Sequence, residues 1–221
     1  MKRKIMDQKK GSEIMRAIEE LSVMVEVRSA TLVPVAEHGD VDDHARDRDA
    51  AFINHEAAHI PTRPFLSLCG LLLQVLDKIG PTMAVLRQDI HQNIRRLEVK
   101  HESDPSTYSN MVEILKMEAT EGIARNVTSS SRAVVWLTRS LDFTVALFQN
   151  LIRDPGKNMK QAVALMLVPD NETFFSSLMA KDENYDKLKV EIETFLSLLV
   201  PYLEQIHSIL RFYHLDKLKS N

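Results

Sequence analysis

Apolar residues recur along most of this chain at spacings of three and four, which is the period of a helix with one buried face. The first such stretch covers residues 12–27, where Ile14, Ile18, Leu21 and Val25 are the apolar positions. No segment shows sustained period-two alternation, so the pattern predicts an all-α protein of roughly seven or eight helices packed in layers. The further predicted helices begin and end near residues 64–80, 81–98, 105–115, 129–153, 157–168, 169–179 and 188–213. Asp104 is the expected cap of the helix that begins at Pro105.

The predicted helices are divided by one long polar segment. From Arg28 to Ala51 the pattern changes, because Pro34 interrupts the chain and residues 37–44 are charged and poor in apolar residues, so we expect an exposed loop there. The helix that follows is apolar nearly all round, which places it at the centre of the core. We therefore predict an N-terminal part, residues 1–61, made of a helix and the charged loop, and a main domain over residues 62–221.

Composition narrows the functional class. The chain is 44% hydrophobic and 27% charged, with a net charge of −3, a balance that argues against a general nucleic-acid binder. The longest apolar run, Phe65 to Leu76, is about half of the ~20 residues needed to cross a bilayer. The basic start of the chain has no apolar stretch after it, so we expect a cytoplasmic protein. The single cysteine, Cys69, lies in an apolar run and is expected to pack as a small hydrophobic residue.

The predicted helix at 81–98 carries a polar face. Asp89, Asn93 and Arg96 stand at i, i+4 and i+7, so a helix places their side chains in one row. An acid, an amide and a guanidinium can together donate and accept hydrogen bonds, which suits a polyhydroxylated or polar head group. The alternative is a solvated helix face with one favourable ion pair.

One sequence motif points to a different chemistry. His55-Glu56-Ala57-Ala58-His59 matches HExxH, which on a helix can hold zinc and activate a water molecule. Pro61 and Pro64 would end such a helix at once, and no third ligand is evident on a downstream helix. A zinc hydrolase therefore stays a remote alternative, because the motif lacks the helix and the third ligand that such a site needs.

The only tryptophan, Trp136, has unusual neighbours. A lone tryptophan at helical spacing usually belongs to the core, but Arg132 at i−4 and Arg139 at i+3 share its side of the predicted helix. Aromatic faces stack on sugar rings and on guanidinium groups, so Trp136 is also a candidate for ligand binding.

Taken together, these motifs resemble the glycolipid transfer protein family, and in particular its plant members, including the accelerated-cell-death type. The resemblance begins near Phe65 and extends to the last residue. Two separated motifs in the correct order make it specific. The matching stretches are Asp89-x-x-x-Asn93-x-x-Arg96, the nine residues 135–143 (Val-Trp-Leu-Thr-Arg-Ser-Leu-Asp-Phe), and the shorter segments 65–70, 77–80 and 168–170.

The resemblance implies a two-layer helical sandwich that hides lipid chains between its layers and transfers sphingolipids between membranes without chemistry or cofactor. By this resemblance Asp89 binds the ceramide amide and a sugar hydroxyl. Asn93 and Arg96 bind the head group, with Arg96 in place of the usual lysine. Trp136 stacks on a sugar, whereas Arg132 matches a basic residue of the branch that carries ceramide-1-phosphate. The expected partners are a sphingolipid and, transiently, membrane surfaces, with the protein acting as a monomer that binds no nucleic acid and no metal.

The chain departs from the family pattern in one place. Family members have a helix containing Trp-His-Gly-Trp before the Val-Pro-Asp segment, and its histidine binds the lipid amide. Here residues 154–161 run directly into 162–169, as if that helix were missing. Two hypotheses therefore stay open, a sphingolipid transfer protein and a module that senses lipid or binds a protein with impaired transfer.

Overall fold

The fold is helical throughout the part of the chain that the computed structural model describes, residues 12–31, 58–153, 176–179 and 184–219. In these ranges the only strand-like pairing is an isolated antiparallel bridge between Pro61 and Asn110. The all-α prediction is confirmed. The helices are α1 (Glu13–Thr31), α2 (Thr62–Ile79), the 3₁₀-helix η1 (Pro81–Met83), α3 (Ala84–Ser103), the 3₁₀-helix η2 (Thr107–Ser109), α4 (Met111–Thr120), α5 (Ser130–Arg153) and α8 (Tyr185–Phe212).

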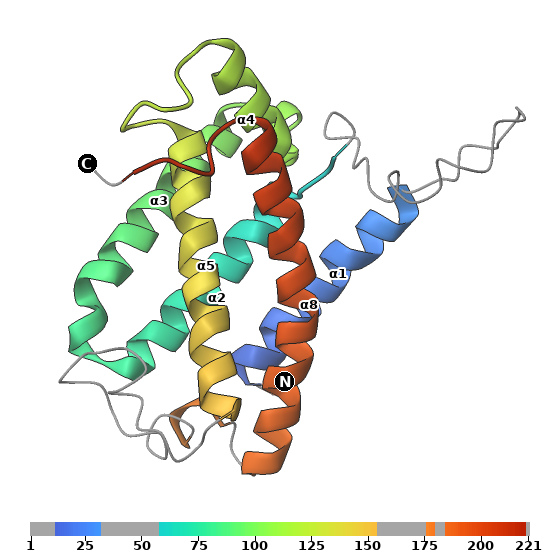
Figure 1. Ribbon diagram of the computed structural model, residues 1–221, viewed down its shortest axis with the longest axis vertical. Helices are drawn as coiled ribbons and strands as arrows, with labels where there is room; N and C mark the ends of the chain where they lie inside the picture. The colour runs from blue at the N-terminus through green and yellow to red at the C-terminus, as the bar shows by residue number, and fades with distance from the viewer. Residues whose placement is uncertain (1–11, 32–57, 154–175, 180–183, 220–221) are drawn as a thin grey trace, which may run out of the picture.

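These helices form two layers around one core (Figure 1). Helices α5 and α8 lie side by side in one layer, α1 and α2 pass behind them, and α3 packs along α5 at the edge. Each of the described α-helices contributes buried apolar side chains to a single core cluster. The two-layer prediction is confirmed, and Cys69 is fully buried in this core, where burial raises the pKa of its thiol.

Two helix boundaries differ from the predictions. Helix α1 continues to Thr31, so residues 28–31 are helical rather than part of the loop, because no helix-breaking residue precedes Pro34. Helix α2 begins at Thr62, and Pro64 is tolerated in its first turn, where the backbone N–H groups have no intrahelical partner. Residues 32–57, which include the rest of the predicted loop, lie outside the described residues, and the predicted division at residue 61 stays a prediction.

The start of α4 also differs from the prediction. Asp104 was the expected cap, but its carboxylate accepts hydrogen bonds from Ser106 and Thr107, ahead of α4, and these bonds lower the pKa of its carboxyl group to about 2. Asn110 caps α4 instead, because its side-chain oxygen accepts from the N–H of Val112 at 3.1 Å. The same oxygen accepts from the N–H of Ile60 at 2.9 Å, so this cap also fixes the strand-like entry to α2.

The ends of the two long helices agree with the predictions. The buried carboxylate of Glu118 accepts from the N–H groups of Ser130 and Ser131 at 2.9 and 2.7 Å, which stabilises the first turn of α5. Helix α8 continues through Pro201 to Phe212, as its apolar spacing indicated. The predicted helix at 157–168 lies outside the described residues, and of the predicted helix at 169–179 only a turn at 176–178 is described.

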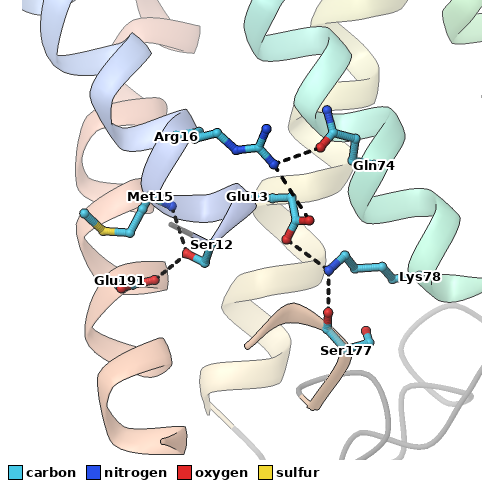
Figure 2. Close-up of polar contacts among 8 residues, drawn as sticks. All are labelled: Ser12, Glu13, Met15, Arg16, Gln74, Lys78, Ser177 and Glu191. Carbon is cyan, nitrogen blue, oxygen red and sulfur yellow. Dashed lines mark hydrogen bonds and ion pairs between the residues drawn. The ribbon is translucent and has the colours of Figure 1, made fainter. Parts of the chain in front are cut away.

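A polar seam fastens the beginning of α1 to the rest of the bundle (Figure 2). The hydroxyl of Ser12 accepts from the N–H of Met15 at 3.1 Å and donates to the buried carboxylate of Glu191 on α8 at 2.7 Å. Glu13 pairs with Lys78 of α2 at 2.9 Å, and the Lys78 ammonium also donates to the main-chain carbonyl of Ser177. The first turn of α1 is thus bound directly to α8 and to α2, and Lys78 of α2 in turn contacts Ser177.

We expect Ser12→Ala to lower the free energy of unfolding by about 1–3 kcal/mol, because it removes a helix cap and also deprives a buried carboxylate of a donor. Urea unfolding followed by circular dichroism measures the change. The control is Ser106→Ala, which removes an exposed hydroxyl contact and should cost less than about 0.5 kcal/mol. Equal effects of the two substitutions would show that the seam does not stabilise the bundle.

Candidate functional site

The two helices that carry the predicted site residues pack against each other, α3 along α5. One contact spans them directly, since the guanidinium of Arg96 donates to the main-chain carbonyl of Ser129, just before α5, at 3.4 Å. The same guanidinium donates to the side-chain oxygen of Asn93 at 3.4 Å. The packing therefore brings the polar row of α3 next to the first turns of α5.

The three residues of the polar row differ in burial. Asn93 is only 4% exposed, and its side-chain N–H donates to the main-chain carbonyl of Asp89 at 2.9 Å. Arg96 is half-buried, whereas Asp89 is exposed at the open end of the row. In the described structure no hydrogen bond or ion pair engages the Asp89 carboxylate, so it is available to accept from a ligand.

Arg132 is the buried cation of the site. Its side chain is on the first turn of α5 and only 7% of the residue is exposed. Among the described residues no carboxylate pairs with it, and its one side-chain hydrogen bond goes to the main-chain carbonyl of Lys219 at 2.9 Å. A guanidinium has five N–H donors, and a buried charge is costly unless it is paired. Arg132 is therefore a charge with unused donors.

Trp136 lies one turn further along α5, half-buried between two guanidinium groups. The central carbon of the Arg139 guanidinium is 4.7 Å from the centre of the ring, and that of Arg132 is 5.9 Å away. Both separations lie within the range of cation–π attraction. Trp136 is therefore not part of the core cluster, and two arginine guanidinium groups lie against its ring.

The segment that follows α8, residues 213–219, crosses α5 at this site (Figure 1). Arg139 donates to the main-chain carbonyl of Asp216 at 3.0 Å, in parallel with the bond from Arg132 to Lys219. We call this segment the strap. It leaves α8 at His214, whose φ of 55° is in the left-handed region. The N–H of His214 donates to the carbonyl of Arg211, and that of Leu215 to the carbonyl of Leu210, a Schellman ending of the helix.

Sequence reasoning identified the arginines and the tryptophan but missed the strap. The strap contributes main-chain carbonyl groups, and every residue carries one, so no side-chain pattern marks those that bind. The nearest sequence signal was the apolar spacing that ended at Tyr213, which gave the point where the chain leaves the helix.

A small apolar cavity lies in the core, between α1, α2, α5 and α8. Its volume is about 20 Å³, which is room for about one water molecule. Ile14 and Ala17 of α1, Leu72 of α2, and the edge-to-face pair Phe148 and Phe195 line it. The first turn of α1, held by the polar seam, forms one wall of this cavity.

The described residues give no support to the zinc site suggested by the HExxH motif. His55 and Glu56 lie outside the described residues, and no group of three or more His, Cys, Asp or Glu side chains suited to a metal occurs in the described part. His207 contacts the Asp142 carboxylate at 2.9 Å, joining α8 to α5, which agrees with a structural role.

Comparison with known proteins places the chain in a family. The sequence pattern of the glycolipid transfer protein family (GLTP) matches residues 60–165. Glycolipid transfer protein 3 of Arabidopsis thaliana is 46% identical over 234 aligned positions, which cover 96% of this chain and 94% of the relative. Glycolipid transfer protein 2 of the same plant is 43% identical over 241 positions, covering 99% of this chain and 98% of the relative. The chain belongs to the glycolipid transfer protein family.

The fold agrees with solved structures. A crystal structure of an Arabidopsis ACD11 (accelerated-cell-death 11) mutant, in complex with ceramide-1-phosphate, superposes with a TM-score of 0.69 at 13% sequence identity. The match covers 94% of this chain and 98% of the ACD11 chain, so the likeness extends over the whole bundle.

The sequence alignment also bears on the missing helix. The alignment with glycolipid transfer protein 2 has 241 positions, more than the 221 residues of this chain, so that relative contains residues with no counterpart here. This agrees with the absence of a Trp-His-Gly-Trp helix, since Trp136 is the only tryptophan in the chain. The place where that helix was expected lies outside the described residues.

We expect His214→Gly to raise the free energy of unfolding by about 1 kcal/mol, because a side chain in the left-handed region is strained and glycine is not. The matched control is His91→Gly, an exposed position inside α3, where the same change should lower it by about 0.5–1 kcal/mol. Urea unfolding of both variants tests the prediction, and a loss of stability in His214→Gly would contradict it.

Proposed function

We propose that this protein transfers sphingolipids between membranes and holds the lipid head group on the face shared by α3 and α5. The observation that carries the proposal is the nearly buried Arg132, which has no carboxylate partner in the described structure and lies beside Trp136 on α5, the helix against which the helix of Asn93 and Arg96 packs. A site that keeps an unpaired charge and an amide next to an aromatic ring is suited to an amphipathic ligand with a polar, hydrogen-bonding head.

Each residue has a role in this proposal. Asp89 accepts hydrogen bonds from the ceramide amide and a sugar hydroxyl at the exposed end of the row. Asn93 and Arg96 bind the head group from the α3 side. Trp136 offers its ring to a sugar, and Arg132 with Arg96 supplies charge-assisted hydrogen bonds to a phosphate.

Two head-group classes fit this arrangement, and the relatives support both. Two relatives that match nearly the whole chain are named glycolipid transfer proteins, which favours a glycosylceramide. The ACD11 mutant structure contains ceramide-1-phosphate, which favours a phosphate. The half-buried tryptophan and the buried arginine occur together here, so we propose that the site accepts either class.

The apolar cavity is the proposed entrance for the lipid chains. At about 20 Å³ it is far too small for an acyl chain, so the surrounding helices must separate before a lipid enters. A chain that spreads α1, α2, α5 and α8 apart exposes no polar backbone, because all four walls are helices. Burial of the hydrocarbon then supplies the driving force, at about 0.8 kcal/mol per CH₂ group.

The proposed activity involves no covalent chemistry and no cofactor. In the described residues no helix is long and apolar enough to cross a bilayer. We propose that the protein works as a monomer in the cytosol and touches membrane surfaces only while it collects or releases lipid.

We expect Asp89→Val to lower the rate of transfer of fluorescent glucosylceramide between vesicles by roughly tenfold or more, the effect of losing charge-assisted hydrogen bonds to the ceramide. The control is Glu102→Val, which removes another exposed carboxylate from α3, close to the far end of that helix. Circular dichroism should show unchanged helicity in both. Absence of transfer by the parent chain for both glucosylceramide and ceramide-1-phosphate would refute the transfer function.

We expect Arg132→Gln to lower the transfer rate of ceramide-1-phosphate about tenfold while changing that of glucosylceramide less than about threefold, because only the phosphate needs the buried charge. Arg153→Gln, at the other end of α5, controls for the loss of one positive charge. Equal losses for the two lipids would contradict the assignment of Arg132 to the phosphate.

A further inference from the structure

The strap is hydrogen-bonded to Arg132, the cation to which the proposed function assigns an anionic head group. We propose that the main-chain carbonyl of Lys219 stands in for that head group on Arg132, and that the strap determines head-group specificity. A phosphate displaces residues 216–219 from α5, whereas a neutral sugar binds with the strap in place. This inference rests on the proposed sphingolipid function and goes beyond it by naming what competes with the ligand.

The contacts of Arg132 indicate that the Lys219 carbonyl and a phosphate head group compete for its guanidinium. The residue is only 7% exposed, and the carbonyl of Lys219 is the one acceptor that its guanidinium has in the described structure, at 2.9 Å. A carbonyl oxygen carries only a partial negative charge. A phosphate group carries a full negative charge, so it adds the attraction of opposite charges, and it can accept two parallel N–H bonds from one guanidinium. A phosphate is therefore the stronger acceptor for Arg132, while a sugar hydroxyl is no better than the carbonyl it would replace.

The strap is built so that only its outer part can leave. Leu215 is buried, and its N–H closes the helix ending at 2.8 Å, so the strap is anchored up to this residue. Beyond it the chain is held by the two arginine contacts, by the N–H of Leu218 donating to the carbonyl of Leu215 at 3.2 Å, and by the half-buried Leu218 side chain. Few bonds need to break for residues 216–219 to detach.

The second arginine contact links the strap to the sugar platform. Arg139 donates to the carbonyl of Asp216 and also lies over the Trp136 ring. Release of Asp216 frees this guanidinium to move relative to the ring, so the strap position and the ring surroundings change together. Because Trp136 is the only tryptophan, its fluorescence reports on this site alone.

Competition has a thermodynamic consequence. If the anionic head group binds only when the strap is released, its apparent affinity is reduced by the fraction of molecules with a released strap. Weakening the strap should then strengthen binding of ceramide-1-phosphate and leave binding of glucosylceramide unchanged. A strap that merely stabilises the fold would affect both lipids equally.

The first test is a binding titration with the full chain, followed by Trp136 emission, using short-chain ceramide-1-phosphate and short-chain glucosylceramide. Leu218→Gly removes the side chain that packs the strap against the core. We expect it to bind ceramide-1-phosphate about tenfold more tightly and glucosylceramide with an affinity within about twofold of the parent. The control Lys217→Gly adds the same backbone freedom at an exposed neighbour, keeps the packing of Leu218, and should not tighten binding of either lipid.

The second test is hydrogen exchange of the parent chain with each lipid bound. We expect the amides of residues 216–219 to exchange faster with ceramide-1-phosphate and to stay unchanged with glucosylceramide. Unaltered exchange with bound ceramide-1-phosphate, or an equal increase with both lipids, would overturn the strap proposal while leaving sphingolipid binding established. Failure of the parent and of Leu218→Gly to bind either lipid would remove the proposed function together with the strap.

Discussion

The packing of α3 along α5 is the constraint on which the site depends. It places the Arg96 guanidinium 3.4 Å from the Ser129 carbonyl, and so sets the polar row of one helix beside the buried Arg132 of the other. Neither helix alone makes a site, since Asn93 and Arg132 are both nearly buried only where the helices meet. In the described residues this cation has no carboxylate partner, and the proposed anionic head group would supply one.

The apolar interior presents the opposite problem. Its described residues pack with a cavity of only about 20 Å³, yet a lipid carrier must admit hydrocarbon chains between the same helices. The first turn of α1, which lines this cavity, is held by two polar contacts. Ser12 donates to Glu191, and Glu13 pairs with Lys78. These contacts lie at one end of the cavity, so they define a closed state without filling the interior with polar groups.

The helices and the polar faces of α3 and α5 could be predicted from the sequence, because the polar residues recur there with the period of a helix. The spacing of Asp89, Asn93 and Arg96, and of Arg132, Trp136 and Arg139, is enough to place each set on one helix face. Asn110 was missed as a cap because Asp104 offered an equally good local signal. The strap carbonyls of Asp216 and Lys219 could not be predicted, because main-chain acceptors have no signature in the sequence. The second of these misses concerns contacts between segments that are distant in the sequence.

The central claim is that one sphingolipid molecule occupies this fold, with its head group on the α3–α5 face. Native mass spectrometry tests it most directly, after the protein has been incubated with vesicles that contain glycerophospholipids, glucosylceramide and ceramide-1-phosphate. The account predicts a one-to-one complex whose added mass is that of a sphingolipid, and weaker retention by Asp89→Val. A protein that emerges without lipid, or that carries a glycerophospholipid instead, would contradict it.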